Sequence, residues 1–488
     1  MPKNRSDPAT DSPALAPAAA QPLVLEPDVP GTSAKYTRGR PFRRYLTWYT
    51  IAYIAIMSVW GAVIGILLPN QVQLLQFSLF FTGADGGVDL QALTLLQQQV
   101  ADGTATATAE EQRLLGLLDD FNGAKASALA VISSIGVALT MIAQPIIGVL
   151  SDRTRSRMGR RAPWILFGGL TGAAALALLP LAPTIAVLGI LFTTAQVLLN
   201  AAQSPLSATI ADRVPEDRRG TASALGGFAS FFGGILGGLL AGALFASIGL
   251  GFYLPLALFV ALGVVLFVLL AGDRSSRELA VPEHRWGSFF AGFTVALRSR
   301  DFRWVWIARI LLTFGYTVST ALSLYLLQSY VRPALSVSEA TGLAPLIALV
   351  GMPATLVAVF VAGRLSDRLG RRKPFVIASS ALMAVSMLVP LVSPTLPAIF
   401  IQAVLAGIAF GIYLPVDQAL FIDVLPDPSS AGRDLGVASL GSNLGQALGP
   451  ILAGTVVAVT GGYLGIWVAA FLLTALAAVA IVPVRGAR

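Results

Sequence analysis

The residues of this chain that could take part in chemistry are acids and bases rather than nucleophiles. The sequence has no cysteine and one histidine, His284, so thiolate chemistry is excluded and little remains for a metal site. Asp417 and Arg309 each lie inside a long apolar run. A carboxylate there is costly when charged, so it tends to bind a proton or to pair with a cation. We predict that Asp417 pairs with Arg309 and exchanges a proton. The alternatives are a static structural bond for Asp417 and snorkelling for Arg309.

A second set of charged residues is written twice in the sequence, 215 positions apart. Each copy has Asp-Arg at the end of one apolar run and Gly-Arg-Arg before the next. The charged members are Asp152, Arg153, Arg160 and Arg161 in the first copy, and Asp367, Arg368, Arg371 and Arg372 in the second. The aspartate can pair with these guanidinium groups, and it can also face the N-terminal dipole of a helix from the other half. We expect a cytoplasmic gate rather than a simple positive anchor.

The composition is that of an integral membrane protein. Hydrophobic residues make up 55% of the chain and charged residues 12%, whereas about a quarter of the residues of a soluble domain are charged. The net charge is +8, but the basic residues lie between apolar segments and are not gathered on a soluble face, which argues against nucleic acid. We expect the partners to be the lipid bilayer and a small-molecule solute, and the chain to be a monomer.

Apolar runs long enough to cross a bilayer predict an all-α membrane protein with twelve transmembrane helices. The predicted spans are 46–69, 126–150, 164–182, 185–210, 222–247, 251–271, 304–328, 342–364, 375–393, 397–421, 435–457 and 464–484. We place both termini in the cytoplasm. Of the 33 Lys and Arg residues, only Arg113, Lys125 and Arg332 are then outside; Arg309 lies in a span, and the other 29 are cytoplasmic, as the positive-inside rule requires.

The repeated motif predicts two parallel six-helix halves, an organisation found in a large class of secondary transporters. We expect a disordered cytoplasmic tail (1–44), a first half (45–271), a cytoplasmic loop (272–303) and a second half (304–488). Glycines four residues apart, which allow close helix contact, recur in both halves: Gly234, Gly238 and Gly242, and then Gly441, Gly445 and Gly449. The first half also has an extracytoplasmic insert (70–125) with short amphipathic helices. We interpret it as a solvated insert; the alternative is a lid or a partner-docking element.

At these motifs the chain resembles the major facilitator superfamily over residues 45–485. The first copy of the motif is four residues longer than the second, as in the glycoside-pentoside-hexuronide:cation symporters and the sucrose/proton symporter-like branch. The stretch Asn200-Ala-Ala-Gln203-Ser-Pro205 is similar to the Asn/Gln-Gly-Pro stretch of the sucrose branch. The resemblance implies a transporter fold whose first, fourth, seventh and tenth helices line the cavity.

The sequence also departs from these relatives. Melibiose-type symporters carry cation-binding aspartates in the second helix, but this second helix has none before Asp152, so we do not expect a sodium site. Gln196 and Ser207 stand where the sucrose branch has an aspartate and an arginine. The Gly-Pro pair of drug antiporters is absent from the fifth helix and occurs instead in the eleventh, at Gly449 and Pro450.

Amide and aromatic residues on helices one, four, seven, ten and eleven are the candidate solute ligands, because such groups share the recognition of a polyol or sugar. They are Tyr53, Trp60, Gln196, Asn200, Gln203, Tyr316, Tyr325, Gln328, Tyr413, Gln418, Asn443 and Gln446. Each single aromatic residue could serve packing instead. The three amides of the fourth helix form the densest group.

We expect a secondary active transporter of the plasma membrane that works by alternating access. The favoured activity is proton-coupled import of a sugar or similar small polar solute, with no cofactor and no metal. Two alternatives stay open: proton-coupled efflux of a drug or metabolite, and a transport-inactive sensor or scaffold that uses the insert. An enzyme is not expected, because the sequence shows no nucleophile constellation, phosphate loop or metal cluster.

Overall fold

The computed structural model describes residues 39–278, 296–425 and 431–484, the side chains of 431–435 excepted. Most of the predicted tail (1–44) and the middle of the predicted loop (272–303) lie outside these ranges. All regular elements of the described residues are helices, as predicted.

The helices of the first half are longer than the predicted spans at several positions. They are α1 (Arg40–Val59), a π-helical stretch (Trp60–Leu67), α2 (Leu68–Phe80), α3 (Leu90–Ala101), α4 (Ala109–Arg153), α5 (Ala162–Leu178), α6 (Ile185–Arg213), α7 (Glu216–Ile248) and α8 (Tyr253–Leu270). The second half contains α10 (Arg300–Thr320), α11 (Ser323–Ser329), α12 (Val337–Leu369), α13 (Lys373–Val392), α14 (Leu396–Asp423), α15 (Ala431–Thr460) and α16 (Leu464–Ile481).

Among the described residues, ten helices are long and apolar enough to cross a membrane, or up to eleven if the bent pair α10–α11 is one span. One of the ten, Glu216–Leu270, comprises both α7 and α8. These two helices cover the same part of α1, because Gly233 of α7 faces Ile54 and Gly263 of α8 faces Ala52 and Ala55. The chain therefore reverses direction between α7 and α8, where Gly249 has a φ of 51°. The total of twelve spans stays a prediction.

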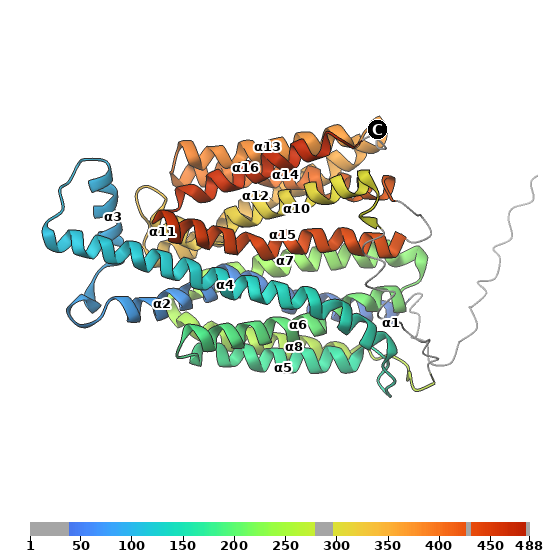
Figure 1. Ribbon diagram of the computed structural model, residues 1–488. Coiled ribbons are helices and arrows are strands. Elements are labelled where there is room, and N and C mark those ends of the chain that lie inside the picture. The colour runs from blue at the N-terminus through green and yellow to red at the C-terminus, as the bar shows by residue number, and fades with distance from the viewer. Residues whose placement is uncertain (1–38, 279–295, 426–430, 485–488) are drawn as a thin grey trace, which may run out of the picture.

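The two halves pack with the same plan. Helix α7 packs on α1 of its own half and on α12 of the other, and α15 packs on α10 and on α4 in the same way. In Figure 1, α4, α7 and α15 lie between the two groups of helices, where α15 packs on α4 and α7 packs on α12. The close contact of α7 with α1 uses Gly233 and Gly237, whereas Gly238 and Gly242 of the predicted stripe face Pro345 of α12. Helix α7 therefore has glycines on two adjacent faces, one toward α1 and the other toward α12.

The insert forms one end of the molecule. In Figure 1, α3 projects at the end opposite to the start of α1 and the end of α16. We call the α3 end the outer end and the opposite end the inner end, following the predicted orientation. Two capping boxes start helices at the outer end: Thr108 and Glu111 at α4, and Ser336 and Glu339 at α12. Such boxes satisfy backbone N–H groups that a helix start leaves without partners.

The insert has a small core of its own. Phe81, Leu93, Leu118 and Phe121 are buried together. The rings of Phe77 and Phe81 stack at 4.9 Å, and the Phe121 ring meets that of Phe81 edge-on at 5.5 Å. The predicted amphipathic helices are therefore α3 and the first turns of α4, and their apolar faces cover each other.

Candidate functional site

A buried ion pair joins α10 to α14. The side chains of Arg309 and Asp417 are 8% and 2% exposed, and Nε of Arg309 donates a hydrogen bond to Oδ2 of Asp417 at 2.7 Å. The Tyr413 hydroxyl, one turn before Asp417, lies beside this carboxylate and interacts with it and with Arg309. Arg309 also donates to the side chain of the exposed Gln418, at 3.3 Å. Phe421 covers the guanidinium group, 4.1 Å from its ring centroid.

The amides of α6 form a short chain with α4. Nε2 of Gln144 donates to Oδ1 of Asn200 at 2.8 Å, and Nδ2 of Asn200 donates to the backbone oxygen of Gln196 at 2.8 Å. The side-chain oxygen of Gln196 is buried and has no partner among the described residues. Gln144 was not among the predicted ligands, although a glutamine beside Pro145 in an apolar span is a usable signal. Gln203 is half-buried.

The remaining predicted solute ligands are spread over the two halves. In the first half, the Tyr53 ring stacks on that of Tyr49 at 5.5 Å, and Trp60 starts the π-helical stretch. In the second half, the Tyr316 ring stacks on that of Phe410 at 5.1 Å. Asn443 is half-buried and Gln446 is exposed, both on α15.

Tyr325 and Gln328 were predicted as cavity residues, but the structure places them at the outer end. Helix α10 ends at Thr320, and the axis of α11 is bent by 45° from that of α10. This bend directs α11 against the first half, where the Tyr325 hydroxyl donates to the backbone oxygen of Pro69 at 2.7 Å.

At the inner end, the first copy of the charged motif forms a compact network. Arg161 is buried; its Nε donates to Oδ2 of Asp212 at 2.9 Å, and its guanidinium group also pairs with Asp152. Arg160 pairs with Asp212 as well. Asp212 was not predicted as a member of the gate, because 51 residues separate it from Arg161. Arg153 ends α4.

The second copy of the charged motif shows fewer ion pairs among the described residues than the first. Arg372 pairs with Asp423 at 2.6 Å, which corresponds to the pairing of Arg161 with Asp212. Asp367, Arg368 and Arg371 are exposed. The described partner of Asp152 is Arg161 of its own half, and the contact of both aspartates with a helix of the other half stays a prediction. The inner ion pairs found among the described residues lie within one half each.

The polar contacts between the halves lie at the outer end. Asn70 of α2 donates to the hydroxyl of Thr341 of α12 at 3.2 Å. Gln98 of α3 donates to the backbone oxygen of Val331 at 3.0 Å, and its own oxygen accepts from the backbone N–H of Ala334 at 3.2 Å. The insert therefore docks on the second half.

Two further contacts strengthen this docking. Gln91 donates to the backbone oxygen of Ala334 at 3.1 Å, and Arg332 pairs with Asp102. The interpretation of the insert as a merely solvated element is wrong for the face of α3 that contacts the second half. These contacts close the molecule at its outer end.

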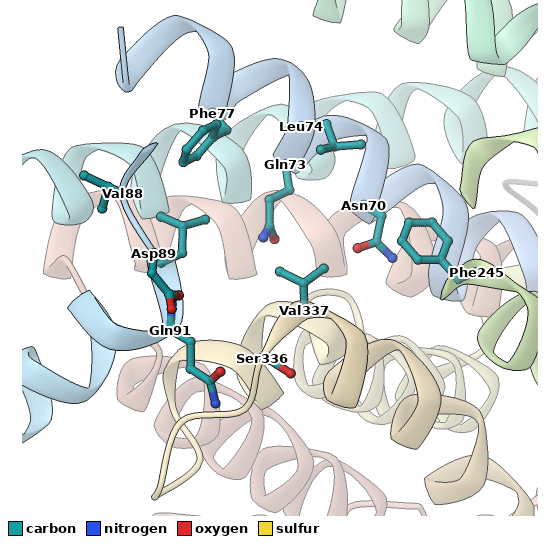
Figure 2. A pocket seen from close by; sticks show the side chains of 11 residues that line it. Asn70, Gln73, Leu74, Phe77, Val88, Asp89, Gln91, Phe245, Ser336 and Val337 are labelled. Carbon is teal, nitrogen blue, oxygen red and sulfur yellow. The ribbon is translucent and has the colours of Figure 1, made fainter. Parts of the chain in front are cut away.

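A cavity of about 320 Å³ lies in this outer seam. Figure 2 shows the amides of Asn70 and Gln73 on one side of it, and Gln91, Ser336 and Val337 on the other. Asn70 and Gln73 are buried, and their side-chain oxygens have no partner among the described residues. A cavity of this size and lining is of the kind that holds small molecules.

The helical halves, the inner charged motifs and a buried acid between helices define a secondary transporter. The chain belongs to the MFS/sugar transport protein family, whose model matches residues 116–482. This confirms the resemblance to the major facilitator superfamily, and the protein is a multi-pass membrane transporter rather than an enzyme.

Two curated relatives match a short segment. The uncharacterized symporter sll1374 of Synechocystis is 51% identical over 55 residues, and the inner membrane symporter YicJ of Escherichia coli is 43% identical over 51 residues. The first match covers 11% of this chain and 10% of the relative, and the second covers 10% and 11%. The matched part thus spans about a tenth of each relative's length.

Solved structures with the same fold cover nearly the whole chain. A point mutant of the nucleoside transporter NupG has a TM-score of 0.64 at 15% identity, over 90% of this chain and 99% of that one. The human organic anion transporter MFSD10 has a TM-score of 0.55 at 17% identity, over 89% and 100%. At these identities the likeness shows the fold alone.

Proposed function

We propose that this protein imports a sugar or a similar small polar solute together with a proton. It would do so as a monomer in the plasma membrane. The coupling residue is Asp417, held by Arg309, and the solute ligands include the amide chain of α6. The symporter names of the two curated relatives support coupled transport, although each covers only about a tenth of this chain.

The observation that carries the proposal is the buried carboxylate of Asp417, which is 2% exposed and accepts a hydrogen bond from Arg309. Removal of an acid from water favours its protonated form, whereas a neighbouring arginine favours its charged form. An acid held between these two influences is a position where a proton would bind and leave during transport. Protonation of the carboxyl group neutralises it and weakens its bond to Arg309.

The contacts of Arg309 connect this event to the solute. Its guanidinium group binds both the buried Asp417 and the exposed amide of Gln418. When the proton reaches Asp417, Arg309 is free to hold Gln418 more firmly or to bind a solute hydroxyl group. The hydroxyl of Tyr413 interacts with both Asp417 and Arg309, so it would also respond to the proton. Proton binding and solute binding thereby use the same arginine.

The test is solute uptake into proteoliposomes under an imposed pH gradient, with a panel of sugars and drugs. We compare the native chain with Asp417→Asn and with Asp120→Asn, which changes an exposed acid of α4. We expect gradient-driven sugar accumulation in the native chain and in Asp120→Asn. Asp417→Asn should lose accumulation but keep sugar exchange down a concentration gradient.

Loss of both accumulation and exchange in a folded Asp417→Asn would assign this residue a structural role instead of coupling. If no sugar is taken up but drugs drive proton movement, the protein is a proton-coupled exporter instead of an importer. Neither sugar nor drug transport, in vesicles with intact protein, would favour a sensor or scaffold.

A further inference from the structure

A second charged residue is buried at the outer end, and the proposed transport cycle does not use it. Lys125 of α4 is 2% exposed. Its Nζ atom lies 4.8 Å from the ring centroid of Phe121 and 4.8 Å from that of Tyr325. Phe121 belongs to the first half and Tyr325 to the second, so the ammonium group lies in the seam between the halves.

Burial lowers the pKa of Lys125 to about 7, whereas the two ring faces and any bound anion favour its charged form. The face of an aromatic ring attracts a cation through its quadrupole within about 6 Å, and it has no such attraction for a neutral amine. The described residues that line the adjoining cavity include Asn122, Gln328, Thr94 and Gln91 but no carboxylate. A buried charge is normally paired with an opposite charge, and here the described residues supply none at contact distance.

The adjoining cavity is lined by two buried polar atoms that also lack a partner among the described residues. Asn122 and Gln328 are 2% and 6% exposed. Oδ1 of Asn122 and Nε2 of Gln328 have no hydrogen-bond partner among the described residues. Both side chains line the cavity together with Lys125. One small group bound there would satisfy the ammonium group and the Gln328 N–H donors together.

We propose that this cavity is a binding site for a monatomic anion, with chloride the abundant candidate. The ligands are the ammonium group of Lys125 from the first half and the amide N–H group of Gln328 from the second. The site is independent of the proposed solute and proton coupling.

The size of the cavity selects the ligand. Its volume is about 20 Å³, and a water molecule needs about 10–15 Å³. One water or one halide ion therefore fits, whereas a carboxylate group with its carbon and two oxygens does not. Water would complete the amide hydrogen bonds but would leave the charge of Lys125 uncompensated. The positive charge therefore favours the halide.

The site also has a route to the outer surface. Leu90, Gln91 and Val337 line both this small cavity and the cavity of about 320 Å³ shown in Figure 2. Movement of the Gln91 side chain would connect the two. Because its ligands come from both halves, the bound anion favours the closed outer end and is released when that end opens.

The experiment measures the thermal unfolding midpoint of the full-length protein in detergent, with chloride replacing gluconate at constant ionic strength. A ligand that binds only the folded state raises the midpoint in a concentration-dependent way. We expect a saturating rise with chloride and bromide, and none with formate. Equilibrium binding of radioactive chloride should give one site per chain.

Lys125→Met should abolish the saturating response. Gln328→Leu keeps the cation and should raise the half-saturating chloride concentration by about tenfold, as expected for a lost hydrogen bond to a charged group. The Gln328→Leu variant keeps the proposal testable if Lys125→Met fails to fold. Arg113→Gln, which removes an exposed cation of the insert, is the matched control and should respond like the native chain.

Three outcomes overturn the proposal. The first is an unfolding midpoint that ignores chloride at constant ionic strength. The second is an equal chloride response in Lys125→Met. The third is formate acting at the same concentration as chloride, which would assign the site to a carboxylate, such as that of a solute, instead of a halide.

Discussion

The docking of the insert predicts that one neutral glutamine holds the outer end closed more firmly than the nearby ion pair. Gln98 makes two hydrogen bonds to the second half, at 3.0 and 3.2 Å. Each such bond contributes about 0.5–1.5 kcal/mol, so Gln98→Ala removes about 1–3 kcal/mol from the closed state. This shifts the equilibrium toward the outer-open state by about 5- to 150-fold.

The ion pair of Arg332 with Asp102 should matter less. Its side chains are 42% and 48% exposed, and exposed pairs contribute about 0.2–1 kcal/mol. Arg332→Gln therefore shifts the same equilibrium by about fivefold at most. The order of the two effects follows from burial and from the number of bonds, and it is opposite to the order that charge alone would give.

The chain is well suited to a distance measurement, because it has no native cysteine. Spin labels on Gly116→Cys of α4 and Val392→Cys of α13 report the separation of the halves; both positions are exposed. Pulsed electron resonance in nanodiscs should show a larger long-distance population in Gln98→Ala than in Arg332→Gln. The exposed neighbour variant Gln99→Ala is the control. Unchanged distances in Gln98→Ala, or a larger change in Arg332→Gln, would refute the role of Gln98 in closing the outer end.

Two further predictions concern stability, measured as thermal unfolding in detergent. Gly237→Ala should cost about 1–3 kcal/mol, because its new methyl group would lie 2.0 Å from the backbone oxygen of Ser58; Gly227→Ala has open space and should cost nothing. Equal effects of the two would refute the contact. Arg161→Gln should cost about 1–3 kcal/mol by leaving buried acceptors unpaired, while the exposed Arg371→Gln should stay within about 0.5 kcal/mol. The reverse order would show that the first motif carries no stability.

The sequence could identify Arg309 and Asp417 as a pair because charged residues inside its apolar spans are so few. It could not identify Asp212 as the partner of Arg161, because that pairing depends on how α6 lies against the start of α5. It also could not show what covers α3. The leucine pattern gives an apolar face, but the glutamines that contact the second half lie on the other faces, where polarity looks the same whether a residue meets water or protein.

The two halves share a backbone plan but differ in their buried chemistry. Asp212 and Asp423 occupy matching places, and Asp417 lies six residues before Asp423, whereas Leu206 lies six residues before Asp212. A buried acid is thus present in α14 and absent from the matching position of α6. Protonation in the second half can affect the first half through the packing of α15 on α4 and of α12 on α7.

Both of these interfaces rely on close helix contact. Gly454 of α15 meets Ala126 and Ala130 of α4, and Gly242 of α7 meets Thr341 and Pro345 of α12. Small residues let the backbones of these helices approach closely, and they leave few side-chain contacts between the halves. The bonds that can hold or release a relative motion of the halves are therefore the polar ones at the two ends. The hydrogen bonds of Asn70 and Gln98 join the halves at the outer end, whereas the ion pairs of Arg161 and Arg372 lie within one half each.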